Sequence, residues 1–134
     1  MYEENQFAHR VVRGTIPVFS LLVMLKSFQR LGYFPRPKDI PSVIIHHIRS
    51  SLRISNETEP NFRTKFIYRH QKAIREHLQV LSFGKDALHI ATNAICKASQ
   101  VMDNPADLIN VSIEELIKER YELPAFSTLD RLAY

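Results

Sequence analysis

Several features typical of enzymes and membrane proteins are scarce in this sequence. The 134 residues contain one cysteine and three glycines, which stand apart at positions 14, 32 and 84. A single cysteine cannot form an intrachain disulfide, which is typical of a reducing compartment. Isolated glycines exclude a glycine-rich phosphate-binding loop. Their small number and the lack of alternating apolar and polar runs favour helices over a sheet. The longest apolar run, residues 16–25, is too short for a membrane-spanning helix of about 20 residues.

Catalytic and metal-binding patterns are also missing. The six histidines follow none of the usual zinc-ligand spacings, and the adjacent His46 and His47 would point about 100° apart on a helix. No serine lies in a nucleophile-elbow motif. Glu114 and Glu115 are paired, but on an expected outward helix face where solvated charge is the usual explanation. We therefore expect no catalytic residue, no metal site and no cofactor in this chain.

Charge is distributed unevenly along the sequence. Residues 1–80 hold 13 Lys/Arg and 6 Asp/Glu, a net charge of +7, whereas residues 81–134 hold 5 and 8, a net charge of −3. Together they give the +4 of the whole chain. This asymmetry indicates that the first part meets phosphate and that the last part meets protein or solvent.

Hydrophobic periodicity predicts an all-α fold, a compact bundle of five to six helices in residues 17–134. The expected helices cover about 17–31, 41–53, 63–80, 85–102 and 105–120, and a sixth begins at Ser127. Helix 17–31 is apolar on almost every side, so we expect it at the centre of the core, ended by Gly32. Asp39 is a candidate cap for helix 41–53. Residues 1–16 show no periodicity and are expected to be a tail or the end of an upstream element.

The segment 63–80 holds the candidate binding site. One side of this helix is an apolar stripe formed by Ile67, His70, Ile74 and Leu78. Another side carries Lys65, Arg69 and Lys72, flanked by Arg63 and Arg75. Like charges at this spacing repel each other by about a few tenths of a kcal/mol per pair. A bound polyanion would relieve that repulsion, so the pattern favours nucleic acid as the partner.

Four further residues are candidates for the same surface. Gln71 is long enough to reach base edges, and His70 could orient a phosphate contact. Arg49 and Arg53 are expected on the outward side of helix 41–53 as flanking phosphate contacts. The alternative for His70 is a core histidine bonded to a backbone carbonyl. The alternative for the basic side is a solvated helix face on which the aliphatic stems of Lys and Arg cover apolar surface. A helix-turn-helix-like arrangement is a further option, although the connection exceeds the usual three to four residues.

Three segments resemble a known protein family. They are residues 25–35 (LKSFQRLGYFP), the group Arg63, Arg69-His70 and Ile74-Arg75, and residues 121–132 (YELPAFSTLDRL). In this order and spacing they are similar to the N-terminal region of the replicative class II transposases, the Tn-three family. The resemblance covers about residues 17–134. It implies a helical region that binds the terminal inverted repeats of a transposon.

The resemblance also implies that this chain is a fragment of a longer transposase. In that family a metal-dependent acidic triad, in a domain far downstream, performs the DNA strand transfer of transposition. We therefore expect a non-catalytic piece, in the bacterial cytoplasm on the nucleoid and away from membranes. Its expected partners are double-stranded transposon-end DNA and the rest of the transposase. The alternative is a protein-interaction or dimerisation domain without direct DNA contact. Its helices from residue 85 onward would dock on that transposase or on a second copy, as a homodimer.

Overall fold

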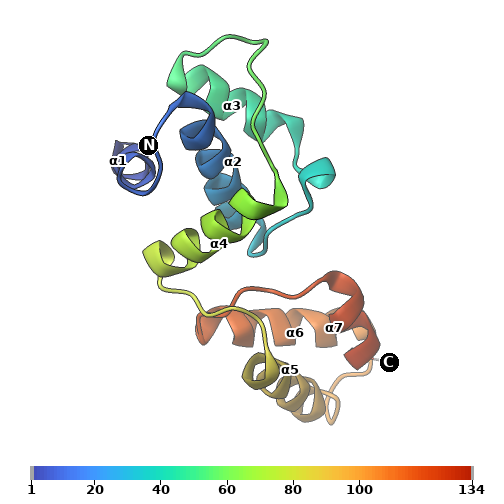
Figure 1. The fold of residues 1–134 in the computed structure, drawn as a ribbon. Helices are drawn as coiled ribbons and strands as arrows, with labels where there is room; N and C mark the ends of the chain where they lie inside the picture. The colour runs from blue at the N-terminus through green and yellow to red at the C-terminus, as the bar shows by residue number, and fades with distance from the viewer. Residues whose placement is uncertain (1, 134) are drawn as a thin grey trace. The chain divides into compact units, whose positions relative to one another are not determined.

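The structure is all-α, as the sequence predicts. The computed structural model describes residues 2–133, which form seven α-helices, one short 3₁₀ helix and no strand (Figure 1). The α-helices are α1 (Tyr2–Val11), α2 (Thr15–Leu31), α3 (Ser42–Leu52), α4 (Thr64–Leu78), α5 (Lys85–Ala98), α6 (Pro105–Lys118) and α7 (Phe126–Ala133), and the 3₁₀ helix is η1 (Pro37–Asp39). All the α-helices from α2 onward occupy predicted segments, whereas η1 lies between two of them.

The chain divides into two compact units, where one domain over residues 17–134 was expected. The first unit is residues 1–78 and the second is residues 79–134. Residues 79 and 80 are uncharged, so the first unit carries the net charge of +7 and the second the net charge of −3. The charge asymmetry of the sequence is therefore a difference between two separately packed bodies.

Helix α2 forms the centre of the first unit. Its side chains are buried through almost three consecutive turns, and α1, α3 and α4 all pack against it. A helix that is apolar on every side needs such neighbours on several sides. Gly32 ends α2 with a φ of 79°, and its N–H donates to the Phe28 carbonyl oxygen at 2.7 Å. This left-handed cap is the ending that the sequence predicts.

The tail expected for residues 1–16 is not found, because residues 2–11 form α1. Phe7 and Ala8 are buried in the core of the first unit. The Phe7 ring stacks on the His77 ring of α4 with centroids 4.0 Å apart, and Lys26 Nζ of α2 lies 3.4 Å from Glu4. Helix α1 spans fewer than three turns, so it is too short for a clear 3.6-residue pattern, and tertiary packing stabilises it instead.

The start of α3 also differs from its prediction. Asp39 does not cap this helix but lies in η1, where its carboxylate accepts a hydrogen bond from Arg36 Nε at 3.0 Å. The residue at the cap position is Pro41, which makes no side-chain cap. Both Arg36 and Asp39 are exposed, so their pairing contributes little to stability.

The second unit is a small bundle of α5, α6 and α7. Helices α5 and α6 pack on each other and α7 packs on both, around a core of Ala87, Ala91, Ile109, Leu116 and Leu129. The Asn104 side chain accepts a hydrogen bond from the Ala106 N–H at 2.9 Å and caps α6. The Leu81 backbone bonds to Arg120 and Glu122 at 2.9 and 2.8 Å, which joins the two ends of the unit.

Candidate nucleic-acid interface

Helix α4 has the two faces that its sequence predicts. His70 and Ile74 are buried and Ile67 and Leu78 are half-buried, and Ile67, Ile74 and Leu78 belong to the core of the first unit. On its outer side, α4 exposes three cations. Because successive residues are rotated by about 100° around the helix axis, these three side chains fall within a sector of about 60°. These are Lys65, Arg69 and Lys72.

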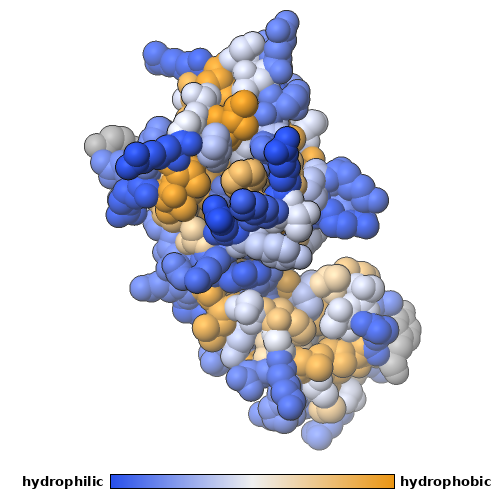
Figure 2. All heavy atoms as spheres, viewed as in Figure 1, coloured by the Kyte–Doolittle hydropathy of each residue, from blue (hydrophilic) through white to orange (hydrophobic). Residues whose placement is uncertain are grey.

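The exposed cations of α4 have no ion-pair partner in the described part of the chain. No ion pair in residues 2–133 involves Arg63, Lys65, Arg69 or Lys72. Glu76 is the one carboxylate of α4, and it lies on the same exposed side. Hydrophilic side chains cover the region of α4 in Figure 2. We call Arg63, Lys65, Arg69 and Lys72 the basic face.

Two residues that were predicted for the DNA-binding surface, Arg75 and Gln71, lie beside the basic face rather than on it. Arg75 is half-buried, and its guanidinium carbon lies 5.2 Å from the centre of the Phe34 ring. Such a cation–π contact holds the side chain against the protein. Gln71 is also half-buried. Arg63 stands just before α4, where its backbone N–H donates to Asn61 Oδ1 at 3.1 Å, and its side chain is exposed.

Arg49 does not lie on the outward surface that was expected. It is 4% exposed, and its Nε and Nη2 donate to the Thr58 carbonyl oxygen at 3.2 and 2.9 Å. Its guanidinium carbon lies 5.6 Å from the centre of the Phe19 ring, and Nη2 lies 3.4 Å from Glu59. Arg49 therefore ties the α3–α4 connection to the core, and helical spacing alone could not show this.

Arg53 and the connection after it also depart from the expected geometry. Arg53 is exposed, but it ends α3 in the left-handed conformation with a φ of 56°. Its side chain therefore does not continue the outward row of α3. The connection to α4 covers residues 53–63, which is much longer than the turn of a helix-turn-helix. Of the two flanking arginines, only Arg53 remains available to a partner.

His70 is buried, which agrees with the alternative of a core histidine and not with that of a phosphate-orienting residue. It is 2% exposed, and its Nδ1 has no hydrogen-bond partner in the described part of the chain. The structure therefore records no carbonyl partner for Nδ1. Burial lowers the pKa of His70 below its ordinary value, because a desolvated imidazolium is disfavoured. His70 is neutral at pH 7 and does not add a charge to the basic face.

The lowered pKa of His70 predicts acid sensitivity. The unfolded chain protonates this histidine near pH 6.5, whereas the folded chain binds the proton only at lower pH. The free energy of unfolding should therefore fall as the pH drops below about 6.5, by up to about 1.4 kcal/mol per pH unit. Urea unfolding between pH 5 and 8 measures this dependence. H70L should have a flatter profile, whereas H47Q, at an exposed histidine, should retain the slope. Equal slopes for the wild type and H70L would contradict the assignment.

Tyr68 is a residue of this surface that sequence reasoning missed. Its side chain is 67% exposed, and it lies one turn from both Lys65 and Lys72. An aromatic ring among cations is a frequent component of surfaces that bind single-stranded nucleic acid, where it stacks on unpaired bases. The signal was present, because Tyr68 falls outside the apolar stripe of α4 and an aromatic residue there has no role in the core.

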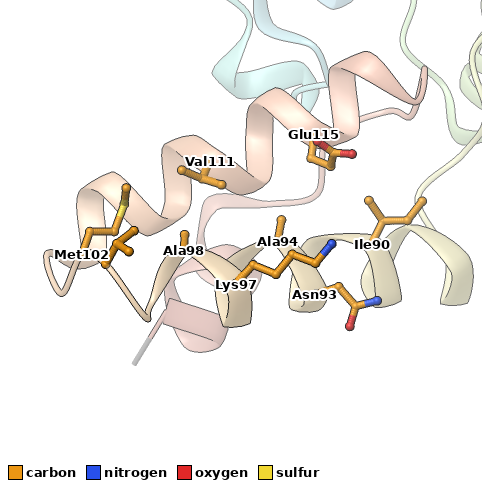
Figure 3. A pocket seen from close by; sticks show the side chains of 9 residues that line it. Ile90, Asn93, Ala94, Lys97, Ala98, Met102, Val111 and Glu115 are labelled. Atoms are coloured by element: carbon orange, nitrogen blue, oxygen red, sulfur yellow. The ribbon is translucent and has the colours of Figure 1, made fainter.

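The second unit has a groove between α5 and α6. Its volume is about 530 Å³, and Figure 3 shows Ala94, Ala98 and Met102 along its floor, with Lys97 from α5 and Glu115 from α6 at its sides. Val101, beside it, is 82% exposed. Figure 2 shows further hydrophobic residues at the surface of this unit. Exposed apolar surface of this kind is typical of a protein contact.

The described residues contain neither a candidate metal site nor a helix that could span a membrane. Residues 2–133 bring together no group of three His, Cys, Asp or Glu side chains that could hold a metal ion. Within the same range, no helix has the length and apolar character that crossing a bilayer requires.

Comparison with known proteins places the chain in a family. No curated protein matches the sequence. One family model, described as a domain of unknown function (DUF4158), matches residues 3–134. This match spans both units. It is compatible with the transposase resemblance, but the family description names no activity. The chain therefore belongs to the DUF4158 family.

Proposed function

We propose that the first unit binds double-stranded DNA through the basic face, as the non-catalytic part of a longer transposase that recognises transposon ends. The observation that carries the proposal is the cluster of Arg63, Lys65, Arg69 and Lys72, which no acidic side chain in residues 2–133 pairs with. Exposed cations bind phosphates and release counterions. The resemblance of residues 25–35 and 121–132 to the Tn-three transposases supports the identity of the DNA.

The test is a gel shift of the whole chain at several salt concentrations. If the four cations of the basic face each contact one phosphate, the logarithm of the association constant should fall against log[salt] with a slope of about −3.6. A transposon-end duplex and a scrambled duplex of equal length separate end recognition from general phosphate binding. Salt-independent binding would contradict the use of the basic face. Equal affinity for both duplexes would contradict recognition of transposon ends.

The second candidate function is a protein-interaction or dimerisation domain. The observation that favours it is the apolar groove between α5 and α6, with Val101 exposed beside it. Size-exclusion chromatography with and without DNA separates the two candidates. The second predicts self-association that DNA does not change, whereas the first predicts a larger complex only when DNA is added.

A further inference from the structure

The first unit contains a cavity beside α4 that shares one residue, Arg69, with the basic face. Its volume is about 580 Å³, which is within the range of about 300–1,000 Å³ typical of small-molecule sites. The apolar part of its wall is Val11, Val12, Ile16 and Phe66. Val11 and Ile16 are 42% and 44% exposed. The cavity thus leaves apolar surface in water that a ligand with an apolar body would cover.

Two uncharged polar residues of the cavity, Ser20 and Asn61, are hydrogen-bonded within the protein, whereas the buried Nδ1 of His70, which also lines the cavity, has no hydrogen-bond partner among residues 2–133. The Asn61 N–H donates to Ser20 Oγ at 2.7 Å, and that hydroxyl donates to the Ile16 carbonyl oxygen at 2.8 Å. Asn61 Oδ1 accepts from the Arg63 N–H. Ser20 and Asn61 thus already hold hydrogen bonds within the protein, and His70 Nδ1 is the buried neutral atom of these lining residues that has none.

Two arginines supply the charged part of the wall. Arg13 and Arg69 line the cavity, and both are exposed residues. Among residues 2–133, neither takes part in an ion pair. A guanidinium group binds a carboxylate through two parallel hydrogen bonds. The cavity therefore combines an apolar wall with two cationic groups that form no ion pair within residues 2–133.

We propose that this cavity binds a small carboxylate with an aliphatic body, its acid group on Arg13 and Arg69 and its chain against Val11, Val12 and Ile16. Each part of the cavity contributes to the choice of ligand. The two guanidinium groups select an anion over a neutral or cationic molecule, and the aliphatic wall selects a carboxylate with a hydrocarbon chain over a bare anion. A DNA phosphate would use the arginines but would leave the apolar wall uncovered.

Binding of such a ligand would also affect the proposed DNA contact. Arg69 belongs to both the cavity and the basic face, so a bound carboxylate and a phosphate would compete for one guanidinium group. This consequence rests on the proposed function. Ligand binding itself does not, and it can be measured without DNA.

The experiment is isothermal titration calorimetry of the whole chain with octanoate, octylamine, octanol and inorganic phosphate. Octanoate should bind at least about tenfold more tightly than octylamine or octanol, which lack the carboxylate, and than phosphate, which lacks the chain. The double variant R13Q/R69Q should lose that advantage. Its matched control is R10Q/K65Q, which removes two exposed cations outside the cavity wall, one three residues before Arg13 and one on the same helix as Arg69, and should bind octanoate like the wild type.

Three results would overturn the proposal. They are no heat of binding with octanoate up to millimolar concentration, equal affinity for octanoate and octylamine, and an equal loss of octanoate affinity in R13Q/R69Q and R10Q/K65Q. Circular dichroism of each variant verifies the fold, which these exposed substitutions should preserve. A chain that binds octanoate but no DNA would contradict the proposed function alone.

Discussion

Replacing Lys65, Arg69 and Lys72 by glutamine should lower the affinity of the whole chain for duplex DNA by about two to three orders of magnitude at 0.1 M salt. Each phosphate contact contributes about 0.9 to the slope of log K against log[salt]. Loss of three contacts should therefore reduce the slope by about 2.7. The three side chains are exposed and have no ion-pair partner within residues 2–133, so the fold should be unaffected. Fluorescence anisotropy of a labelled duplex at several salt concentrations measures both quantities.

The matched control for this triple variant changes the net charge equally but elsewhere on the first unit. R10Q/R30Q/K38Q also removes three exposed cations, from α1, α2 and η1. If the basic face is the DNA site, the control should keep most of the affinity and most of the salt slope. Equal losses in the two variants would mean that DNA responds only to total charge, and the assignment to α4 would be wrong.

The helices from α2 onward were predictable because their signals are local. Helix α2 is apolar on almost every side and ends at a glycine, and α6 begins with the Asn104-Pro105 cap. In α4 the apolar stripe and the cationic side are separated at 3.6-residue spacing. The burial of His70 and Ile74 and the exposure of Lys65, Arg69 and Lys72 follow from that spacing alone.

The features that could not be predicted depend on contacts between distant segments. Helix α1 is held by the burial of Phe7 and by its stacking on His77, which is far away in the sequence. The division into two units lies at residue 78, where no proline-rich or glycine-rich linker marks it. The cavity wall joins residues of α1 and α2 to Phe66 and Arg69 of α4, and no pattern within one helix could bring them together.

The second prediction with a large expected effect concerns Arg49 and the stability of the fold rather than DNA binding. Substitution R49M keeps an apolar stem beside Phe19 but removes the hydrogen bonds to the Thr58 carbonyl oxygen. A hydrogen bond from a charged donor contributes about 1.5–3 kcal/mol, so the free energy of unfolding should fall by about 2–3 kcal/mol. The pairing with Glu59 adds little, because that carboxylate is largely exposed. Urea unfolding followed by circular dichroism measures the loss.

The control for R49M is R53Q, at an exposed arginine one turn further along. Its unfolding free energy should stay within about 0.5 kcal/mol of the wild type. The two possible roles of Arg49 predict opposite pairs of results. A buried structural arginine requires R49M to lose stability while the folded protein keeps its DNA salt slope. A phosphate contact requires unchanged stability and a slope smaller by about 0.9. Because Arg49 already donates two hydrogen bonds to Thr58 and is shielded from solvent, we expect the first pair.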